Sequence, residues 1–504
     1  MRPLVHEIST SHTPESLAEQ LRGQSADRSC VEDQPQHHPT GLVLLRSAFF
    51  DSAQSRYSFL AARPFLIFRS FGSRCELHFP ERTDIQFGNP WHLLDSLMSR
   101  YELLEELDLP FPLGGCFGFW GYDLKNFVEP KLSRRAVNDL ELPECHVGFY
   151  DSLVVFDHRL SKTWIVSTGL SADGSRNEQI ARQRAEWWQR LLSSQIQSSK
   201  FDVQSSMFDV SSVRDPNPPS LISSNLSRDE FLARVLRAQA YIRAGDIYQV
   251  NLSHRLAAPF PSSGWQLFQN LSDVSPAPFS AYLDCGDFQL ASSSPELFLR
   301  LSGSHIQTRP IKGTRPRSSD PTRDAQLTYE LQTSSKEMAE LVMITDLLRN
   351  DLGKVCEFGS VQVPELVRLE RFPQVQHLVS TVEGQLRHGV THFSAFASCF
   401  PGGSITGAPK FRAMEIIDEL EPLARGPYTG ALGYLGFNRE SQLSITIRTA
   451  VCKNGAAYFH AGAGIVADSI PAAEYDETLA KARGFLQALP QMETQFAGIR
   501  EIRG

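Results

Sequence analysis

Short strand-like segments joined by turn residues run through the whole chain. In the C-terminal half they span residues 247–252, 279–283, 288–291, 297–301, 361–369, 430–436, 444–451 and 457–460. Between the last two, Lys453-Asn454-Gly455 carries the Asn-Gly signal of a tight hairpin. Successive short strands joined by turns favour antiparallel sheets over a doubly wound parallel sheet. The sequence therefore predicts an α+β fold with mainly antiparallel sheets.

The N-terminal half shows a similar pattern, with strand-like segments at 41–47, 64–71, 152–156 and 163–167 and a helix at 177–192. Residues 193–224 are rich in serine, contain prolines and lack a sustained period, as is typical of a linker. We expect a two-sheet core with helices on the outside. The predicted parts are an N-terminal sheet-rich domain (1–192), a linker (193–224), a second domain (225–490) and a C-terminal tail (491–504).

Two predicted helices carry pairs of acidic residues. One holds Glu337 and Glu340, and the other holds Glu474 and Glu477. Residues three apart lie on one surface of a helix, so each helix offers a pair of carboxylates. The two helices span residues 334–352 and 471–489.

These carboxylates have two possible roles. Lys336 with Glu340 and Glu477 with Lys481 have the i,i+4 spacing of ordinary surface ion pairs. The alternative is a magnesium site, because a hard cation takes oxygen ligands, often one or two carboxylates together with water and an anionic substrate group. The sequence alone leaves both possibilities open.

The stretch QTRPIKGTRPR at 307–317 concentrates positive charge. Its prolines and Gly313 exclude an extended helix, so we expect a rigid turn around Lys312. A solvated basic loop is the simplest interpretation. Because the whole chain has a net charge of -8, broad capture of nucleic acid or of an anionic membrane is disfavoured, and a local anion site is the alternative. The cationic residues are Arg309, Lys312, Arg315 and Arg317.

Several other classes of protein are disfavoured. The first residues carry charges and prolines where a secretory signal needs an apolar core, and no apolar run reaches the roughly 18 residues that span a bilayer, so we expect a cytoplasmic protein. The 8 cysteines are scattered without a CxxC pair, which argues against zinc and disulfides. Cys116 has the G-x-C-x-G form of a nucleophile elbow, but no histidine is followed two residues later by glutamate, so we expect it to be structural.

A series of motifs in the second domain resembles the chorismate-utilising enzyme family, which includes anthranilate, aminodeoxychorismate, isochorismate and salicylate synthases. The resemblance covers residues 225–485 and is highly specific, and segments such as GLVLLRSAFF (41–50) and GGCFGFWGYD (114–123) extend it to the N-terminal half. It implies a fold like that of anthranilate synthase component I. The main motifs are YIRAGDIYQVNLSHR (241–255), SSSPELFLR (292–300), RPIKGTRPR (309–317), KEMAELVMITDLLRNDLGKV (336–355), VQHLVSTVEG (375–384), FPGGSITGAPKFRAMEIIDELE (400–421), RGPYTGALGYLG (425–436) and AGAGIVADSIPAAEYDETLAKA (461–482).

Three positions bear on which member of the family this chain resembles. Family enzymes that add water to the ring have a lysine where this chain has Gln249, so isochorismate chemistry is disfavoured. Anthranilate synthases resemble PIAGT at 310–314, whereas this chain reads PIKGT, the form of aminodeoxychorismate synthases, with Lys312 at the diagnostic position. The LLES motif of tryptophan feedback reads LLRS here, with Arg46 in place of the acidic residue.

The resemblance gives Lys312 and Glu296 catalytic roles. Lys312 would add to ring carbon 2, and Glu296 of the SPE motif would act as general acid and base. A free lysine, with a pKa of about 10.4, is charged at neutral pH. The neighbouring arginines and partial burial would lower that pKa, whereas a dianionic substrate and adjacent carboxylates would raise it, and the sequence leaves the balance open.

The resemblance also assigns binding residues. Glu340 and Glu477 match magnesium ligands, with Glu474 nearby through water, and the forked guanidinium of Arg448 suits the enolpyruvyl carboxylate. Gly462, Ala463 and Gly464 could present backbone N–H groups to the substrate. The other positions that line the family's pocket are Tyr428, His377, Ser404, Lys481, Gly313 and Gln249.

The implied activity is that of component I of an aminodeoxychorismate synthase, which converts chorismate and ammonia to 4-amino-4-deoxychorismate for 4-aminobenzoate and folate synthesis. Because the chain shows no recognisable amidotransferase, ammonia from glutamine would come from a separate subunit, which implies a heterodimer. Two alternatives stay open. One is anthranilate synthase component I, and the other is a catalytically inactive relative with a regulatory role.

Overall fold

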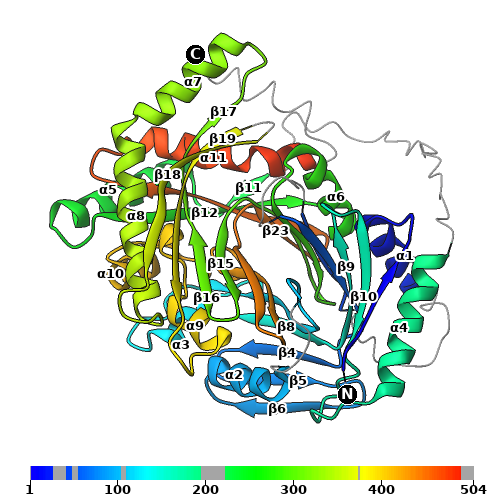
Figure 1. Ribbon diagram of the computed structural model, residues 1–504. Coiled ribbons are helices and arrows are strands. Elements are labelled where there is room, and N and C mark those ends of the chain that lie inside the picture. The colour runs from blue at the N-terminus through cyan, green and yellow to red at the C-terminus, as the bar shows by residue number, and fades with distance from the viewer. Residues whose placement is uncertain are drawn as a thin grey trace, which may run out of the picture.

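The computed structural model describes residues 2–26, 41–47, 55–103, 109–194, 222–372 and 375–489. Two large antiparallel sheets form the centre of the molecule, and helices lie around them (Figure 1). This confirms the predicted α+β class and the two-sheet core. In the described part of the chain, no helix is long and apolar enough to cross a membrane.

The first sheet joins strands from both halves of the chain, since β2 pairs with β13. Its strand order is β1 (Leu4–Ile8), β10 (Lys162–Ser167), β9 (Ser152–Asp157), β3 (Tyr57–Ala61), β2 (Val43–Arg46), β13 (Phe279–Asp284), β14 (Gln289–Ser294), β23 (Thr449–Lys453), β24 (Ala456–Ile465), β12 (Gln249–Pro259) and β11 (Ser223–Ser224), with β20 (Gly407–Ala408) also paired to β12.

The second sheet is built in the same way, since β7 pairs with β21. Its strand order is β17 (Ile311–Pro316), β19 (Val375–Gln385), β16 (His305–Arg309), β15 (Leu297–Ser302), β22 (Glu440–Ile445), β21 (Ala431–Gly436), β7 (Gly115–Trp120), β8 (Cys145–Tyr150), β4 (Leu66–Phe71), β5 (Arg74–His78) and β6 (Thr83–Phe87), with β18 (Gln362–Arg371) also paired to β19.

The helices cover the sheets and carry part of the candidate site. Helix α8 packs against β17 and β19, and α11 packs against β24. The α-helices are α1 (Pro14–Ala26), α2 (Pro90–Tyr101), α3 (Lys125–Val128), α4 (Glu178–Ser193), α5 (Arg228–Arg243), α6 (Gly264–Val274), α7 (Pro321–Thr333), α8 (Ser335–Gly353), α9 (His392–Cys399), α10 (Lys410–Leu420) and α11 (Pro471–Ala488).

Aromatic and aliphatic side chains from both halves of the chain fill the largest of the hydrophobic clusters in the described residues, which stabilises the fold by removing apolar surface from water. Tyr434 shows this mixing, because its ring stacks on Phe117 at 5.3 Å between centroids and meets the edge of Phe59 at 5.0 Å. Strands and core therefore run across the two halves. Most of the predicted linker, residues 195–221, and the predicted tail, 491–504, lie outside the described residues.

Local sequence signals are confirmed at two places. Ser227 and Glu230 form the predicted capping box at the start of α5. Asn454 and Gly455, both with positive φ, join β23 to β24 as the predicted hairpin.

The expectation of a rigid turn over 307–317 is wrong, because this stretch forms β16 and β17 on either side of Pro310. Strand β17 lies at the edge of its sheet. Pro316 is tolerated there, because an edge strand has one side on which no backbone N–H group has to donate to a neighbouring strand. Gly313, with φ +71°, lies in the register shift between Lys312 and Thr314. The proline and glycine therefore mark an edge strand with a bulge.

Other strands also differ from the prediction. The predicted single strand at 444–451 is wrong, because β22 ends at Ile445 and β23 begins at Thr449. Strand β12 continues seven residues beyond the predicted end at 252, to Pro259, and β19 was not among the predicted strands at all. Most residues of β19 are buried on both faces, so its sequence lacks the alternation of polar and apolar residues that marks a half-exposed strand.

Candidate active site

Lys312 and Glu296 come together at the loop that carries Ser404. The Lys312 Nζ atom lies 3.4 Å from the carbonyl oxygen of Ser404 and is close enough to Glu296 to stabilise its charged form. Glu296 lies just before β15 and is only 6% exposed. The Ser404 side chain also hydrogen-bonds the Glu296 carboxyl group. An amine, a carboxyl group and a hydroxyl group therefore share one place between the sheets.

Burial raises the pKa of the Glu296 carboxyl group. The Ser404 side chain, the Lys312 charge and the N–H group of Ile311 act in the opposite direction, but burial has the larger effect. A carboxyl group with a raised pKa holds its proton closer to neutral pH, as a general acid requires.

The arginines around Lys312 are engaged elsewhere. The guanidinium of Arg309 lies 2.5 Å from Glu370, that of Arg315 lies 3.2 Å from Glu337, and that of Arg317 lies 2.8 Å from Asp324. The sequence analysis expected these three charges to repel Lys312. Because each is offset by a carboxylate, that repulsion is weakened.

The predicted acidic residues of α8 and α11 face one another. Lys336 of α8 lies 3.9 Å from Glu474 of α11, and Glu477 is close enough to Glu340 to raise its pKa. Of the two expected surface pairs, Glu477 with Lys481 is present at 2.7 Å.

The protonation of these carboxylates follows from their surroundings. Burial, reinforced by the negative charge of Glu477, raises the pKa of both Glu340 and Glu474. At Glu477 partial desolvation opposes the effect of Lys481 and other lysines, but the net pKa is lowered. Three carboxylates that repel one another form a donor set suited to a hard cation.

Within the residues that the structure describes, no three His, Cys, Asp or Glu side chains are arranged closely enough to hold a metal ion. Lysine ammonium groups lie among the three carboxylates instead, since Lys312 and Lys336 both stabilise the charge of Glu340. The carboxylates therefore fit magnesium by their chemistry, and binding would require the side chains to move closer together.

Arg448 is suited to bind an anion. No hydrogen bond or ion pair within the described residues engages its guanidinium, and burial lowers its pKa. Its backbone has φ +49°, in the left-handed region that a side chain disfavours. Arg448 is partly buried. A partly buried guanidinium without a partner carries a desolvation cost, which a carboxylate ligand would offset.

His377 links Arg448 to the bulge of β17. Its Nδ1 atom lies 2.8 Å from the hydroxyl oxygen of Thr314, and a hydrogen bond joins its ring to the backbone of Gly313. Burial and the charge of Arg448 lower the pKa of His377 to about 4, so the ring is neutral at physiological pH. The structure thus brings His377, Gly313 and Arg448 close together.

The segment Gly462-Ala463-Gly464 of β24 is the meeting point of three other predicted residues. Lys481 Nζ donates a hydrogen bond of 2.9 Å to the carbonyl oxygen of Gly462. A Cβ atom on Gly462 would lie 2.7 Å from the Tyr428 hydroxyl, and one on Gly464 would lie 2.5 Å from Nε2 of Gln249. Glycine is needed at Gly462, where a Cβ atom would also lie 2.8 Å from the backbone oxygen of Leu252, whereas at Gly464 the flexible Gln249 side chain could move away.

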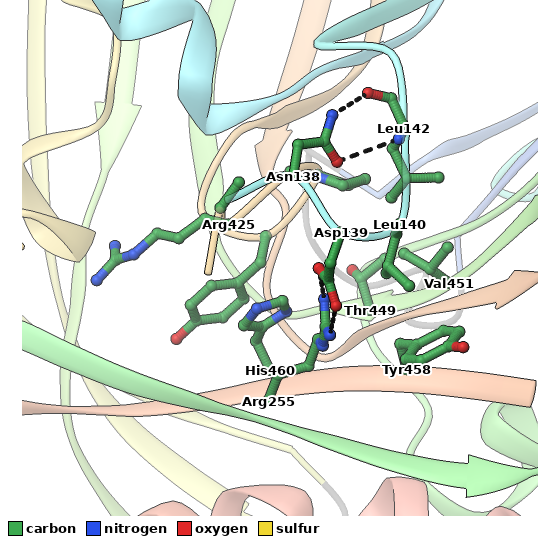
Figure 2. A pocket seen from close by; sticks show the side chains of 14 residues that line it. Asn138, Asp139, Leu140, Leu142, Arg255, Arg425, Thr449, Val451, Tyr458 and His460 are labelled. Carbon is green, nitrogen blue, oxygen red and sulfur yellow. Dashed lines mark hydrogen bonds and ion pairs between the residues drawn. The ribbon is translucent and has the colours of Figure 1, made fainter. Parts of the chain in front are cut away.

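Tyr428 also lines a pocket with Arg255 and His460. Figure 2 shows this pocket. The Tyr428 ring stacks on His460 with 5.0 Å between centroids. Arg255 donates a hydrogen bond of 2.8 Å to Asp139 and lies beside His460 in the pocket wall (Figure 2). The stacked His460 ring packs against one face of the Tyr428 ring and helps to hold its orientation.

Sequence reasoning missed two groups. The first is a buried network in which Arg425 binds the carboxylate of Glu421 through Nε at 2.8 Å and Nη2 at 2.7 Å. The second is Asn251, which points to the same face of β12 as Gln249 because strand residues two apart share a face. This two-residue period was the sequence signal that could have identified Asn251. Cys116, in contrast, is fully buried and its thiol pKa is raised well above the usual value, so it is structural as expected.

Comparison with known proteins gives one consistent result. The family model described as "chorismate binding enzyme" matches residues 46–487. "Anthranilate synthase component 1" of Acetivibrio thermocellus is 38% identical over 451 residues, covering 89% of this chain and 90% of that protein. "Aminodeoxychorismate synthase component 1" of Escherichia coli (strain K12) is 39% identical over 454 residues, covering 90% and 94%.

A solved structure supports the same relationship. The crystal structure of anthranilate synthase component I from Streptococcus pneumoniae TIGR4 superposes with a TM-score of 0.73 at 29% identity, covering 90% of this chain and 95% of that one. Because the two named activities match this chain almost equally in sequence, the choice between them depends on the residues of the site.

Proposed function

The chain is a member of the chorismate-binding enzyme family, and we propose that it aminates chorismate to 4-amino-4-deoxychorismate as component I of an aminodeoxychorismate synthase. The observation that carries the proposal is the position of Lys312, whose amine lies beside the buried carboxyl group of Glu296 at the Ser404 loop. A relative named for this activity is 39% identical over 90% of the chain.

The proposed reaction is a double displacement. Lys312 first loses its ammonium proton to water. The neutral amine then adds to ring carbon 2, the two ring double bonds shift, and the 4-hydroxyl group leaves as water with a proton from Glu296. Ammonia then attacks carbon 4, the double bonds shift back, and the bond from carbon 2 to Lys312 breaks. The Glu296 carboxylate takes up the proton that ammonia loses, so chorismate and ammonia give 4-amino-4-deoxychorismate and water.

Two features of the site support the roles of acid and nucleophile. Burial raises the pKa of Glu296, which favours the protonated form that a donor to the departing hydroxyl group requires. Gln249, which is 2% exposed, carries an amide that cannot deprotonate water, so amination is favoured over hydration at this site.

Arg448 would bind the enolpyruvyl carboxylate, and its lack of a protein partner supports that role. Glu340, Glu474 and Glu477 would hold magnesium, which when bound acts as a Lewis acid and template at the ring carboxylate. Lys481 would complete the substrate pocket beside Gly462, to which it donates a hydrogen bond of 2.9 Å.

Ammonia would be supplied by a glutamine amidotransferase subunit in a heterodimer, in keeping with the name "component 1" of the relatives. The product would serve 4-aminobenzoate and folate synthesis, and the cytoplasm is the expected location. The second candidate function is anthranilate synthase component I, which is favoured by the relative at 38% identity. A catalytically inactive regulatory relative is a third possibility, which the retention of Lys312 and Glu296 together disfavours.

Product analysis tests the proposal. The full chain would be incubated with chorismate, magnesium and ammonium chloride, and the products separated and identified by mass spectrometry. We expect 4-amino-4-deoxychorismate, which a lyase added afterwards converts to 4-aminobenzoate. Formation of fluorescent anthranilate would support the second candidate instead, and no turnover with a competent ammonia source would support the inactive relative.

A further inference from the structure

Two side-chain amides on β12 have polar atoms without partners. The Nε2 atom of Gln249 and the Oδ1 atom of Asn251 are both buried, and within the described residues neither makes a hydrogen bond. The two residues point to the same face of the strand, which also carries Gly462 and Gly464 of β24. A buried polar atom without a partner is costly, so such atoms in a candidate site indicate ligand contacts.

The Asn251 oxygen lies beside residues of the proposed pocket. A Cβ atom on Gly462 would lie 2.7 Å from Oδ1 of Asn251 and 2.7 Å from the Tyr428 hydroxyl oxygen, so both oxygens converge on this glycine. Lys481 reaches the same glycine from α11 through its carbonyl oxygen. Asn251 Oδ1 therefore adjoins residues that we assign to substrate binding.

The backbone of Asn251 is held on both sides. Its N–H group donates a hydrogen bond of 2.8 Å to the carbonyl oxygen of Thr406, which follows the Ser404 loop. Its carbonyl oxygen accepts a hydrogen bond of 2.8 Å from Nη2 of Arg425. The side chain consequently starts from a fixed position, as a group that orients a small ligand requires.

The unpartnered atom of Asn251 is a carbonyl oxygen, which only accepts hydrogen bonds. Its ligand must therefore supply an N–H or O–H donor. The carboxylates and the ether oxygen of chorismate cannot do so. The 4-hydroxyl group of chorismate has one O–H donor, and ammonia carries three N–H donors. A neutral amide also lacks the negative charge with which a carboxylate would favour ammonium over the nucleophilic free base.

We propose that Asn251 Oδ1 binds the incoming ammonia and orients its lone pair toward the ring. This inference rests on the proposed amination of chorismate, and it applies to attack at either ring carbon. Gln249, with an unpartnered donor on the same face, would contact the substrate and leave ammonia to Asn251. The subsite is thus a specificity determinant for the nitrogen nucleophile.

The test is steady-state kinetics with ammonium chloride as the varied substrate and chorismate saturating, followed by the reverse design. We expect Asn251→Ala to raise the apparent KM for ammonium about tenfold, the effect of losing one hydrogen bond, with the KM for chorismate within about twofold of wild type. Asn251→Asp should favour bound ammonium and shift the pH profile for ammonium use toward higher pH.

Ser253→Ala is the matched control. Ser253 lies on the same face of β12, but its hydroxyl donates a 3.0 Å hydrogen bond to buried Glu421. We expect this variant to change thermal stability and leave the KM for ammonium unchanged. Circular dichroism spectra of all variants check that the fold is retained.

The outcomes separate the inference from the proposed function. An unchanged ammonium KM in Asn251→Ala overturns the inference alone, and so does a raised chorismate KM, which would assign the oxygen to the substrate hydroxyl group. Anthranilate as the wild-type product overturns the proposed function, while the ammonium KM of the variant still decides the role of Asn251. A wild-type protein that forms neither product overturns both.

Discussion

Arg425 and Arg448 lie in neighbouring motifs, yet their surroundings differ, since Arg425 is fully buried and Arg448 is only partly buried. Arg425 binds Glu421 through two nitrogens and also donates to the backbone of Asn251 at 2.8 Å and to Thr429 at 3.1 Å. For Arg448 the described residues provide no such partner. A buried cation whose donors are satisfied holds the fold together, whereas an unsatisfied one is available to a ligand.

The basic stretch at 307–317 repeats this contrast over a few residues. Arg315 and Arg317 have carboxylate partners at 3.2 and 2.8 Å. Lys312, between Arg309 and Arg315, makes no ion pair within 4.0 Å in the described part of the chain, and its amine only approaches the Ser404 carbonyl oxygen at 3.4 Å. The sequence alone does not distinguish these cationic residues from one another. In the structure, the arginines that form ion pairs are structural, whereas Lys312, which forms none in the described part of the chain, is the proposed nucleophile.

The largest effect is expected for Lys312→Ala. Turnover should fall by about 10³-fold or more, because the proposed nucleophile is lost, while the thermal unfolding midpoint stays close to wild type. Arg317→Ala is the paired control, since it removes a neighbouring cation whose partner is Asp324, and it should retain most of its activity. Equal losses of activity in both variants would break the contrast between paired and unpaired cations.

Arg425→Leu should destabilise the protein by about 3–5 kcal/mol, because it leaves the buried carboxylate of Glu421 without its cation. Urea unfolding monitored by tryptophan fluorescence measures this change. A loss below about 1 kcal/mol would show that the network around Arg425 is not structural.

Arg448→Leu should have the opposite profile. Removing a charge-assisted hydrogen bond to a substrate carboxylate corresponds to about 1.5–3 kcal/mol, which is roughly a 10- to 150-fold increase in the KM for chorismate. Stability should change little or increase, because a partly buried charge without a partner is removed. If the variant is strongly destabilised and the KM is unchanged, Arg448 is a structural residue like Arg425.

The smallest effect concerns Glu144, whose Oε2 atom is also buried without a hydrogen-bond partner. Burial and the nearby charge of Asp123 raise the pKa of this carboxyl group to about 7, so it avoids an unpaired charge by keeping its proton. Because the pKa in the folded state is raised, its contribution to stability is present below about pH 4.5 and is lost as the pH rises through 7.

Glu144→Gln should remove that pH dependence. We expect the variant to match wild type near pH 5 and to exceed it by about 1–2 kcal/mol at pH 8, as measured by urea unfolding at both values. A variant that is less stable than wild type at pH 8 would indicate that the Glu144 carboxylate has a favourable partner. The contrast between charged groups with and without partners would then hold only for the cationic residues.

Local signals in the sequence predicted much of the fold. The capping box at Ser227, the Asn-Gly hairpin and the helices with paired carboxylates depend on residues close together in the chain, and all are present. The bulged edge strand β17 was missed, because pairing with β19 decides whether a proline- and glycine-containing segment becomes a turn or a strand.

The same distinction applies to the site. The resemblance predicted roles for Lys312, Glu296 and the glycine segment. In the structure Lys312 lies near Glu296, and Gly462 lies near Lys481 and Tyr428. The Arg425 network and the unpartnered oxygen of Asn251 could not be predicted, because they depend on the register between β12 and β24 and on which hydrogen bonds remain unmade. Only the folded structure shows which buried polar atoms lack a hydrogen-bond partner.

The most direct test of Lys312 as the nucleophile is intact-protein and peptide mass spectrometry of the enzyme mixed with chorismate and magnesium in the absence of ammonia. We expect the peptide that contains Lys312 to carry a covalent adduct with the mass of chorismate less water. The adduct should disappear when ammonium chloride is added and 4-amino-4-deoxychorismate forms. Normal turnover without any adduct on Lys312, together with full activity of Lys312→Ala, would contradict this role.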